Sequence, residues 1–184
     1  MEKSTSVGSS LGGAMYRSHE TATPYDRVVG AVVWSDKRPG FAVIVGETKT
    51  SLKVLAEAEN LTLSRLVAHC GELHEKFNVD TWYGDPGNAK LAGALAEYNK
   101  TRHAQGKATI NLVPAPHVDA TNPLAFCVKT IEEHVARLDM GGAGGVTEAV
   151  REKVWQDRVH QGVEEFPRVA ALGYAVSAIE RYPL

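Results

Sequence analysis

The stretch Val79–Asn88 (VDTWYGDPGN) decides how the rest of the chain is interpreted. It opens with an aromatic run that predicts a strand over Asp80–Tyr83, and a helical pattern starts at Asn88. Asp85 therefore stands where a strand gives way to a turn and a helix. In open α/β sheets ligands bind at the carboxyl ends of the strands, which makes Asp85 the first candidate for a functional residue. The alternative is that Asp85 only stabilises the turn, because Asp, Pro, Gly and Asn are ordinary residues of turns and helix starts.

The bulk composition is that of a soluble globular protein. The chain has 184 residues, of which 43% are hydrophobic and 23% charged, and this length suits one domain. A net charge of −2 gives no global basic field for nucleic acid, although local basic patches are compatible with it. No apolar run approaches the roughly 20 residues of a membrane span, and no signal core is present. We therefore expect a cytoplasmic protein, with Cys70 and Cys127 as buried free thiols.

The beginning of the chain differs in composition from the rest. Residues 1–24 are dominated by Ser and Gly, and we expect them to form a flexible arm or a linker from a larger chain. Residues 25–184 form the predicted domain. It contains no P-loop, GxGxxG or GxSxG motif, and no Cys/His cluster has the spacing of a zinc site.

Periodicity predicts the order of the elements. Apolar runs at 27–34 and 41–47 and an alternating run at 52–59 predict three antiparallel strands, with Leu52, Val54, Ala56 and Ala58 on one face of the third. Short strands follow at 80–83 and 110–113, and the later strands are joined by helices, so they should be parallel. Helices are predicted at 63–77, 88–101, 122–138, from Thr147 onward, and 168–181. The prediction is an α/β fold with a mixed five-stranded sheet, three antiparallel strands then two parallel, and helices on both faces.

Three short stretches add a family resemblance. They are Val28–Val32 with the hairpin into Phe41–Val45, then Tyr83–Asn88 with the helix after it, and Ala170–Ala175 in the final helix. Together, over roughly residues 25 to 182, they resemble the ribonuclease H-like superfamily, and within it the nuclease domain of phage terminase large subunits. The resemblance implies metal-dependent phosphodiester hydrolysis by two Mg²⁺ or Mn²⁺ ions held by clustered carboxylates.

The acidic residues match this family unevenly. The family has one acid in the first strand, one at the end of the fourth strand and one in the last helix. Asp85 matches the second, whereas Val32 and Ala170 stand where the other two are expected. The nearest substitutes flank those elements: Asp26 or Asp36 beside the first strand, and Glu164 or Glu165 before the last helix. Of these we select Asp36 and Glu165, with Asp85, as predicted catalytic residues and metal ligands.

Two functions follow from the resemblance, and a third does not need it. The first is a terminase-like nuclease domain acting on DNA during phage genome packaging, phage- or prophage-encoded, with a packaging ATPase or portal-type protein as partner. The second is a catalytically degenerate ribonuclease H-like module that binds a protein or nucleic-acid partner. The third is an unrelated α/β domain with a small-molecule pocket near Asp85 and Asn88. Lys37 and Arg38, at a predicted hairpin tip, are either DNA contacts or an ordinary solvated turn.

Overall fold

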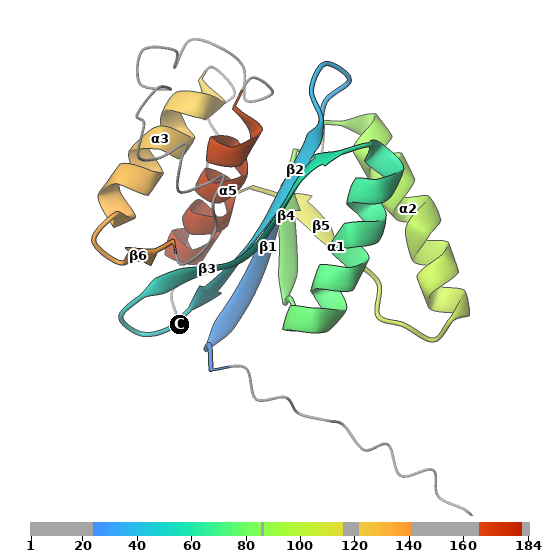
Figure 1. Cartoon of the computed structure of the whole chain (residues 1–184), viewed down its shortest axis with the longest axis horizontal. Helices are drawn as coiled ribbons and strands as arrows, with labels where there is room; N and C mark the ends of the chain where they lie inside the picture. The colour runs from blue at the N-terminus through green and yellow to red at the C-terminus, as the bar shows by residue number, and fades with distance from the viewer. Residues whose placement is uncertain (1–23, 86, 116–121, 141–165, 182–184) are drawn as a thin grey trace, which may run out of the picture.

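The computed structural model describes residues 24–85, 87–115, 122–140 and 166–181 (Figure 1). Within these ranges the chain forms six strands and four helices. The strands are β1 Arg27–Val33, β2 Gly40–Glu47, β3 Leu52–Leu61, β4 Thr81–Gly84, β5 Leu112–Pro114 and β6 Leu138–Asp139. The helices are α1 Leu63–Phe77, α2 Ala89–Ala104, α3 Pro123–His134 and α5 Pro167–Arg181. The predicted N-terminal arm, apart from Pro24, and the helix predicted from Thr147 lie outside the described residues.

The strands form one mixed sheet in the order β5-β4-β1-β2-β3-β6. The first three strands are an antiparallel meander, β4 pairs parallel with β1, and β5 pairs parallel with β4. The predicted α/β architecture is confirmed in this arrangement. The predicted strand number was wrong, because β6 adds a sixth strand that pairs parallel with β3.

The sixth strand arises because α3 ends earlier than its apolar spacing predicts. The helix was expected to continue to Leu138, but it ends at His134, and a tight turn follows. Leu138 then pairs with Leu52, whose backbone N–H donates to the carbonyl of Arg137 at 2.8 Å. An open strand edge leaves backbone groups without partners, so this pairing satisfies the start of β3. Val135 follows the end of the helix and is 58% exposed, although continuing the apolar spacing of α3 would place it inward.

The helices cover both faces of the sheet, and each face has its own apolar core. Figure 1 shows α1 and α2 on one side and α3 and α5 on the other. Successive side chains of a strand point to opposite faces. In β1, Val28 and Val32 accordingly join the core under α1 and α2, while Val29 and Val33 join the core under α3 and α5. Burial on both faces therefore explains the continuous apolar run of β1.

The third strand departs from its predicted facing. Simple alternation predicted Leu52, Val54, Ala56 and Ala58 on one face. Instead Leu52 and Val54 join the core under α5, whereas Ala56 and Ala58 face α1. The pairing with β2 shifts register between Ile44 and Val45, which leaves an extra residue in β3. A β-bulge of this kind reverses the facing of every residue beyond it.

Helix α5 is enclosed by the rest of the fold. Every residue from Val169 to Ile179 is buried, because the sheet lies against one side of the helix and α3 against another. Gly173 permits this close packing: a Cβ there would lie 2.4 Å from the Cβ of Cys127 on α3. The helix is nevertheless only 15 residues long, and none of the helices in the described part of the chain is long and apolar enough to cross a membrane.

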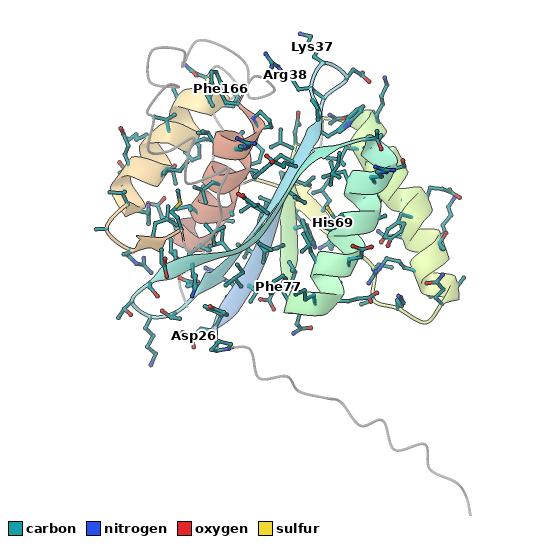
Figure 2. The ribbon with its side chains drawn as sticks, viewed as in Figure 1. Asp26, Lys37, Arg38, His69, Phe77 and Phe166 are labelled. Atoms are coloured by element: carbon teal, nitrogen blue, oxygen red, sulfur yellow. The ribbon has the colours of Figure 1, made fainter. Side chains whose placement is uncertain are left out.

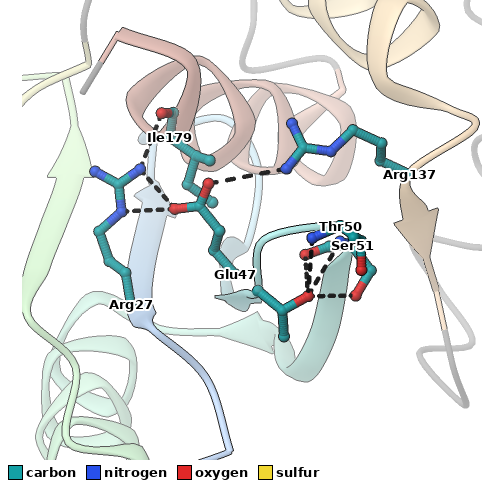
Figure 3. Close-up of polar contacts among 7 residues, drawn as sticks. Arg27, Glu47, Thr50, Ser51, Arg137 and Ile179 are labelled. Carbon is teal, nitrogen blue, oxygen red and sulfur yellow. Dashed lines mark hydrogen bonds and ion pairs between the residues drawn. The ribbon is translucent and has the colours of Figure 1, made fainter. Parts of the chain in front are cut away.

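A buried carboxylate fastens the end of α5 to the sheet (Figure 3). Glu47, at the end of β2, is only 6% exposed. Arg27 donates to its Oε2 from Nε at 3.0 Å and from Nη2 at 2.7 Å, and Arg27 Nη2 also donates to the carbonyl of Ile179 at 2.9 Å. A second cation, Arg137, lies 3.9 Å from Oε1. A charge this deeply buried is tolerated because its partners are fixed around it.

We expect Arg27→Met to lower the free energy of unfolding by about 3 kcal/mol, because it leaves the Glu47 charge buried without its main partner. Lys53→Met is the matched control, since Lys53 and Asp139 form an exposed pair at 3.9 Å that should contribute less than about 1 kcal/mol. Urea unfolding of both variants measures the difference. Equal losses in the two variants would contradict a structural role for the Glu47 pair.

A second titratable group is His74, in the last turn of α1. The Nδ1 atom of His74 is buried without a hydrogen-bond partner. Burial, and then the nearby charge of Arg102, lower the pKa of His74 below its usual 6.5, while Glu75 and Asp80 act in the opposite direction. The folded protein therefore holds this imidazole neutral, and protonation favours the unfolded chain.

This lowered pKa predicts acid-sensitive stability. The stabilisation is complete above the unfolded pKa of 6.5 and is lost as the pH falls toward the lower folded-state pKa. Urea unfolding at about pH 7.5 and about pH 5.5, on either side of that unfolded pKa, should show a smaller loss of stability in His74→Gln than in the wild type. Identical losses in the two proteins would assign the acid sensitivity to other groups.

Candidate functional site

Asp85 lies at the end of β4, as predicted from the sequence. Its side chain is exposed, and its Oδ1 accepts a hydrogen bond from the backbone N–H of Gly87 at 2.8 Å. Gly84 before it packs closely: a Cβ there would meet both the carbonyl oxygen of Val32 and a side-chain carbon of Leu112 at 3.0 Å. Asp85 therefore has the turn-stabilising role of the simpler interpretation, and also stands beside the end of β1.

Asn88 ties the start of α2 to the end of β1. Its Oδ1 caps the helix by accepting from the N–H of Leu91 at 3.1 Å, and its Nδ2 donates to the carbonyl of Trp34 at 2.6 Å. One amide thus satisfies a free helix donor and fixes the loop that follows β1. The first turn of α2, which carries Lys90, is held at a fixed position against that loop.

A surface hollow of about 410 Å³ opens between these two segments. Asp36 and Asp85, both predicted as site residues, line it together with Asn88. The full lining is Val32, Val33, Trp34, Ser35, Asp36, Lys37, Asp85, Gly87, Asn88, Ala89, Lys90, Leu91 and Tyr174. A second hollow of similar size lies across the same loop, lined by residues 34–39 and 61–63. Trp34 to Lys37 line both hollows.

Asp36 is engaged by a cation rather than left open. The Lys90 ammonium donates to both carboxylate oxygens of Asp36, each at 2.7 Å, and lies 6.0 Å from the centre of the Trp34 ring. The two partners are 54 positions apart and come together only through the packing of α2 beside the hairpin. Sequence reasoning missed Lys90. The available signal was its place in the first helical turn after Asp85.

The two positions expected to carry acids have different surroundings. Val32 lines the hollow and lies beside Gly84, with its side chain in the core under α1 and α2. Ala170 is fully buried under α3, where its carbonyl is contacted by the Cys127 thiol at 3.7 Å. The α5 residue on the hollow is Tyr174, one turn further along. The helix therefore borders the hollow with a tyrosine instead of an acid.

Of the proposed substitute acids, Asp36 lines the hollow and Asp26 does not. Figure 2 shows Asp26 at the opposite end of the sheet from Lys37, which lines the hollow. Glu164 and Glu165 lie outside the described residues. Among residues 24–85, 87–115, 122–140 and 166–181, no three His, Cys, Asp or Glu side chains form a cluster that could hold a metal ion.

These residues do not fit a two-metal centre. Hard cations such as Mg²⁺ need several oxygen ligands, including carboxylates that are free to bind them. In the hollow, Asp36 is bound by an ammonium, Val32 offers no oxygen on its side chain, and Asp85 is the remaining carboxylate. The described part of the site provides charge and hydrogen bonds, without the ligand set for metal-activated water.

Basic side chains extend beyond the hollow. Lys37 and Arg38 lie at the tip of the β1–β2 hairpin, where Figure 2 shows them projecting past the end of the sheet. The hydroxyl of Ser35 accepts from the backbone N–H groups of both residues, at 3.3 and 3.2 Å, which shapes the tip. With Lys90, they give this end of the sheet three cations on two neighbouring segments.

The cysteines take no part in the site. Cys70 and Cys127 are free and buried, as predicted, in the cores on opposite faces of the sheet. Burial raises the pKa of the Cys127 thiol to about 12 and that of Cys70 still further above its usual range. Both side chains therefore remain protonated thiols at neutral pH and act as small apolar groups.

Comparison with known proteins gives information on the fold of the chain. No protein-family model matches the sequence, and no curated protein does. The large terminase of a thermophilic bacteriophage superposes with a TM-score of 0.57 at 12% identity, covering 86% of this chain and 40% of that one. The large terminase nuclease of thermophilic phage G20c, solved with bound zinc, gives 0.54 at 15% identity, covering 85% and 81%.

A third similar structure is the Holliday junction resolvase of fowlpox virus, with a TM-score of 0.51 at 9% identity, covering 84% of this chain and 98% of that one. This chain thus spans about 40% of the length of the first terminase but nearly all of the resolvase. The chain has the ribonuclease H-like fold of these nucleases, as the sequence resemblance predicted. Identities this low establish the fold alone, and function must be argued from the site.

Two substitutions at Asp85 separate its turn role from any chemical role. We expect Asp85→Asn to keep the stability of the wild type, because the amide oxygen can still accept from Gly87. Asp85→Ala should lose about 1 kcal/mol, the usual contribution of one such hydrogen bond. Urea unfolding measures both variants. A stable Asp85→Ala variant would show that the turn does not depend on this side chain.

Proposed function

We propose that this chain is a ribonuclease H-like module that binds DNA through the end of the sheet carrying the β1–β2 hairpin, without two-metal catalysis. The observation that carries this proposal is the ion pair of Lys90 with Asp36 in the hollow beside Val32 and Asp85. It supplies a fixed cation where the family resemblance leads one to expect a carboxylate–metal cluster. In this proposal the chain keeps the ribonuclease H-like fold, and an ion pair stands in the hollow in place of a metal cluster.

Three cations support DNA as the partner. Lys37 and Lys90 line the hollow and Arg38 lines its neighbour across the same loop. Phosphate contacts from Lys and Arg supply most of the affinity in sequence-independent binding, and they need no overall positive charge on the protein. The terminases and the resolvase with this fold make DNA the first partner to test.

The nuclease interpretation remains the competing prediction. In it, Asp85, Asp36 and Glu165 would hold Mg²⁺ or Mn²⁺, and the partners would include a packaging ATPase or portal-type protein. It requires Lys90 to release Asp36 and a third acid, Glu165, to bind the same ions; Glu165 lies outside the described residues. The bound zinc of the G20c nuclease is a property of that protein and gives a further metal to test here.

Binding to a labelled duplex, followed by fluorescence anisotropy, tests the proposal. We expect the double variant Lys37→Ala/Arg38→Ala to weaken binding and to reduce the slope of log K against log salt by about 2, one for each phosphate that the variant no longer neutralises. Lys100→Ala is the control, since Lys100 is an exposed lysine paired with Glu97 on the far part of α2. Unchanged binding in the double variant, or no binding by the wild type, would overturn the proposal.

The same preparation tests catalysis. Plasmid incubated with the wild type and Mg²⁺, Mn²⁺ or Zn²⁺ should stay intact. Nicking by the wild type that is lost in Asp85→Ala would establish the nuclease interpretation instead. Nicking that persists in Asp85→Ala would mark a contaminating nuclease.

A further inference from the structure

We propose that the ammonium of Lys90 takes the place of a divalent metal ion in the hollow, so that the site accepts a phosphate without added metal. This inference rests on the proposed DNA-binding function and gives the hollow a specific means of recognition. The juxtaposition that carries it is Lys90 held between the carboxylate of Asp36 and the ring of Trp34, beside Asp85.

The position of Lys90 is set by the fold. The residue lies in the first turn of α2, and that turn is fixed by the two hydrogen bonds of Asn88, to Leu91 and to Trp34. The ammonium donates to both carboxylate oxygens of Asp36, each at 2.7 Å. It also lies 6.0 Å from the Trp34 ring centre, within the range of cation–π attraction.

The charges of the hollow explain why a cation is needed there. Its lining contains two carboxylates, Asp36 and Asp85, and two ammonium groups, Lys37 and Lys90. Formal charges therefore sum to zero with Lys90 present and to −1 without it. A phosphate entering a negative site meets repulsion, which in metal-dependent nucleases the ions remove. Lys90 gives the same neutralisation from within the chain.

Lys100 shows what an ordinary lysine on the same helix looks like. It pairs with Glu97 at 2.7 Å, and both side chains are 74% exposed. That pair joins neighbouring turns of one helix, lines neither hollow and has no aromatic partner among the ring contacts of the described residues. Lys90 and Lys100 thus differ in surroundings while sharing helix, residue type and salt-bridge length.

Chemical rescue by a metal ion tests the inference. Duplex binding is measured in EDTA and in millimolar Mn²⁺, at constant ionic strength. The wild type should bind equally in both, and Lys90→Ala should lose about tenfold in EDTA, which corresponds to about 1.4 kcal/mol, and recover in Mn²⁺. Lys100→Ala should behave as the wild type. A metal requirement in the wild type, or a Lys90→Ala defect that Mn²⁺ leaves unchanged, would overturn the inference.

A measurement without DNA separates this inference from the proposed function. Mn²⁺ binding followed by electron paramagnetic resonance should be stronger in Lys90→Ala than in the wild type, and the gain should vanish in Lys90→Ala/Asp36→Asn. Wild-type protein that fails to bind DNA but shows this pattern would refute the function and keep the role of Lys90. Tight binding of two ions by the wild type would refute the role of Lys90. An exposed ion pair contributes little to stability, so the variants should fold.

Discussion

Close packing of β4 against β1 is the constraint on which the architecture of the site depends. Gly30 lies opposite Trp82, and a Cβ on Gly30 would approach that indole ring to 2.6 Å. Gly84 meets the backbone of Val32 in the same way at 3.0 Å. Two glycines thus let a large aromatic side chain and a short strand pack onto β1. The strands end side by side as a result, and the turn that carries Asp85 opens beside the loop after Val33.

The sequence predicts those parts of the fold whose causes are local. The apolar runs of β1 and β2 are buried on both faces, and Asn78 ends α1 in the left-handed conformation with φ of 49°, as its place after the apolar pattern indicates. The missed features depend on distant partners. The strand β6 forms by pairing with β3, which is far from it in the sequence, and the facing of β3 reverses at a bulge in its pairing with β2. Neither cause is visible in a short window of sequence.

In the candidate site too, features with local causes were predicted and features that depend on distant partners were missed. Asp85 follows from the change of period at the end of β4, and Asp36 from its place after β1; both line one hollow. The state of Asp36 could not be predicted, because its partner Lys90 lies 54 positions away on another element. The place of Tyr174 on the hollow could not be predicted for a related reason. Which face of α5 meets the hollow depends on the packing of Gly173 against Cys127. Sequence patterns identified the elements that meet at the hollow, whereas their packing determines which side chains interact there.

The balance of charge in the hollow has a physical consequence beyond stability. The side chains of Lys90 and Asp36 are 64% and 63% exposed, and an ion pair so exposed contributes little to the folded state. Its effect is electrostatic, because it cancels one of two carboxylates at the opening between the ends of β1 and β4 and the start of α2. A buried pair such as Arg27–Glu47 holds elements together, whereas the exposed pair sets the charge that an incoming ligand meets. The fold thus has the same type of interaction at both ends of the sheet: one pair is buried and joins elements, and the other is exposed and changes the charge of the hollow.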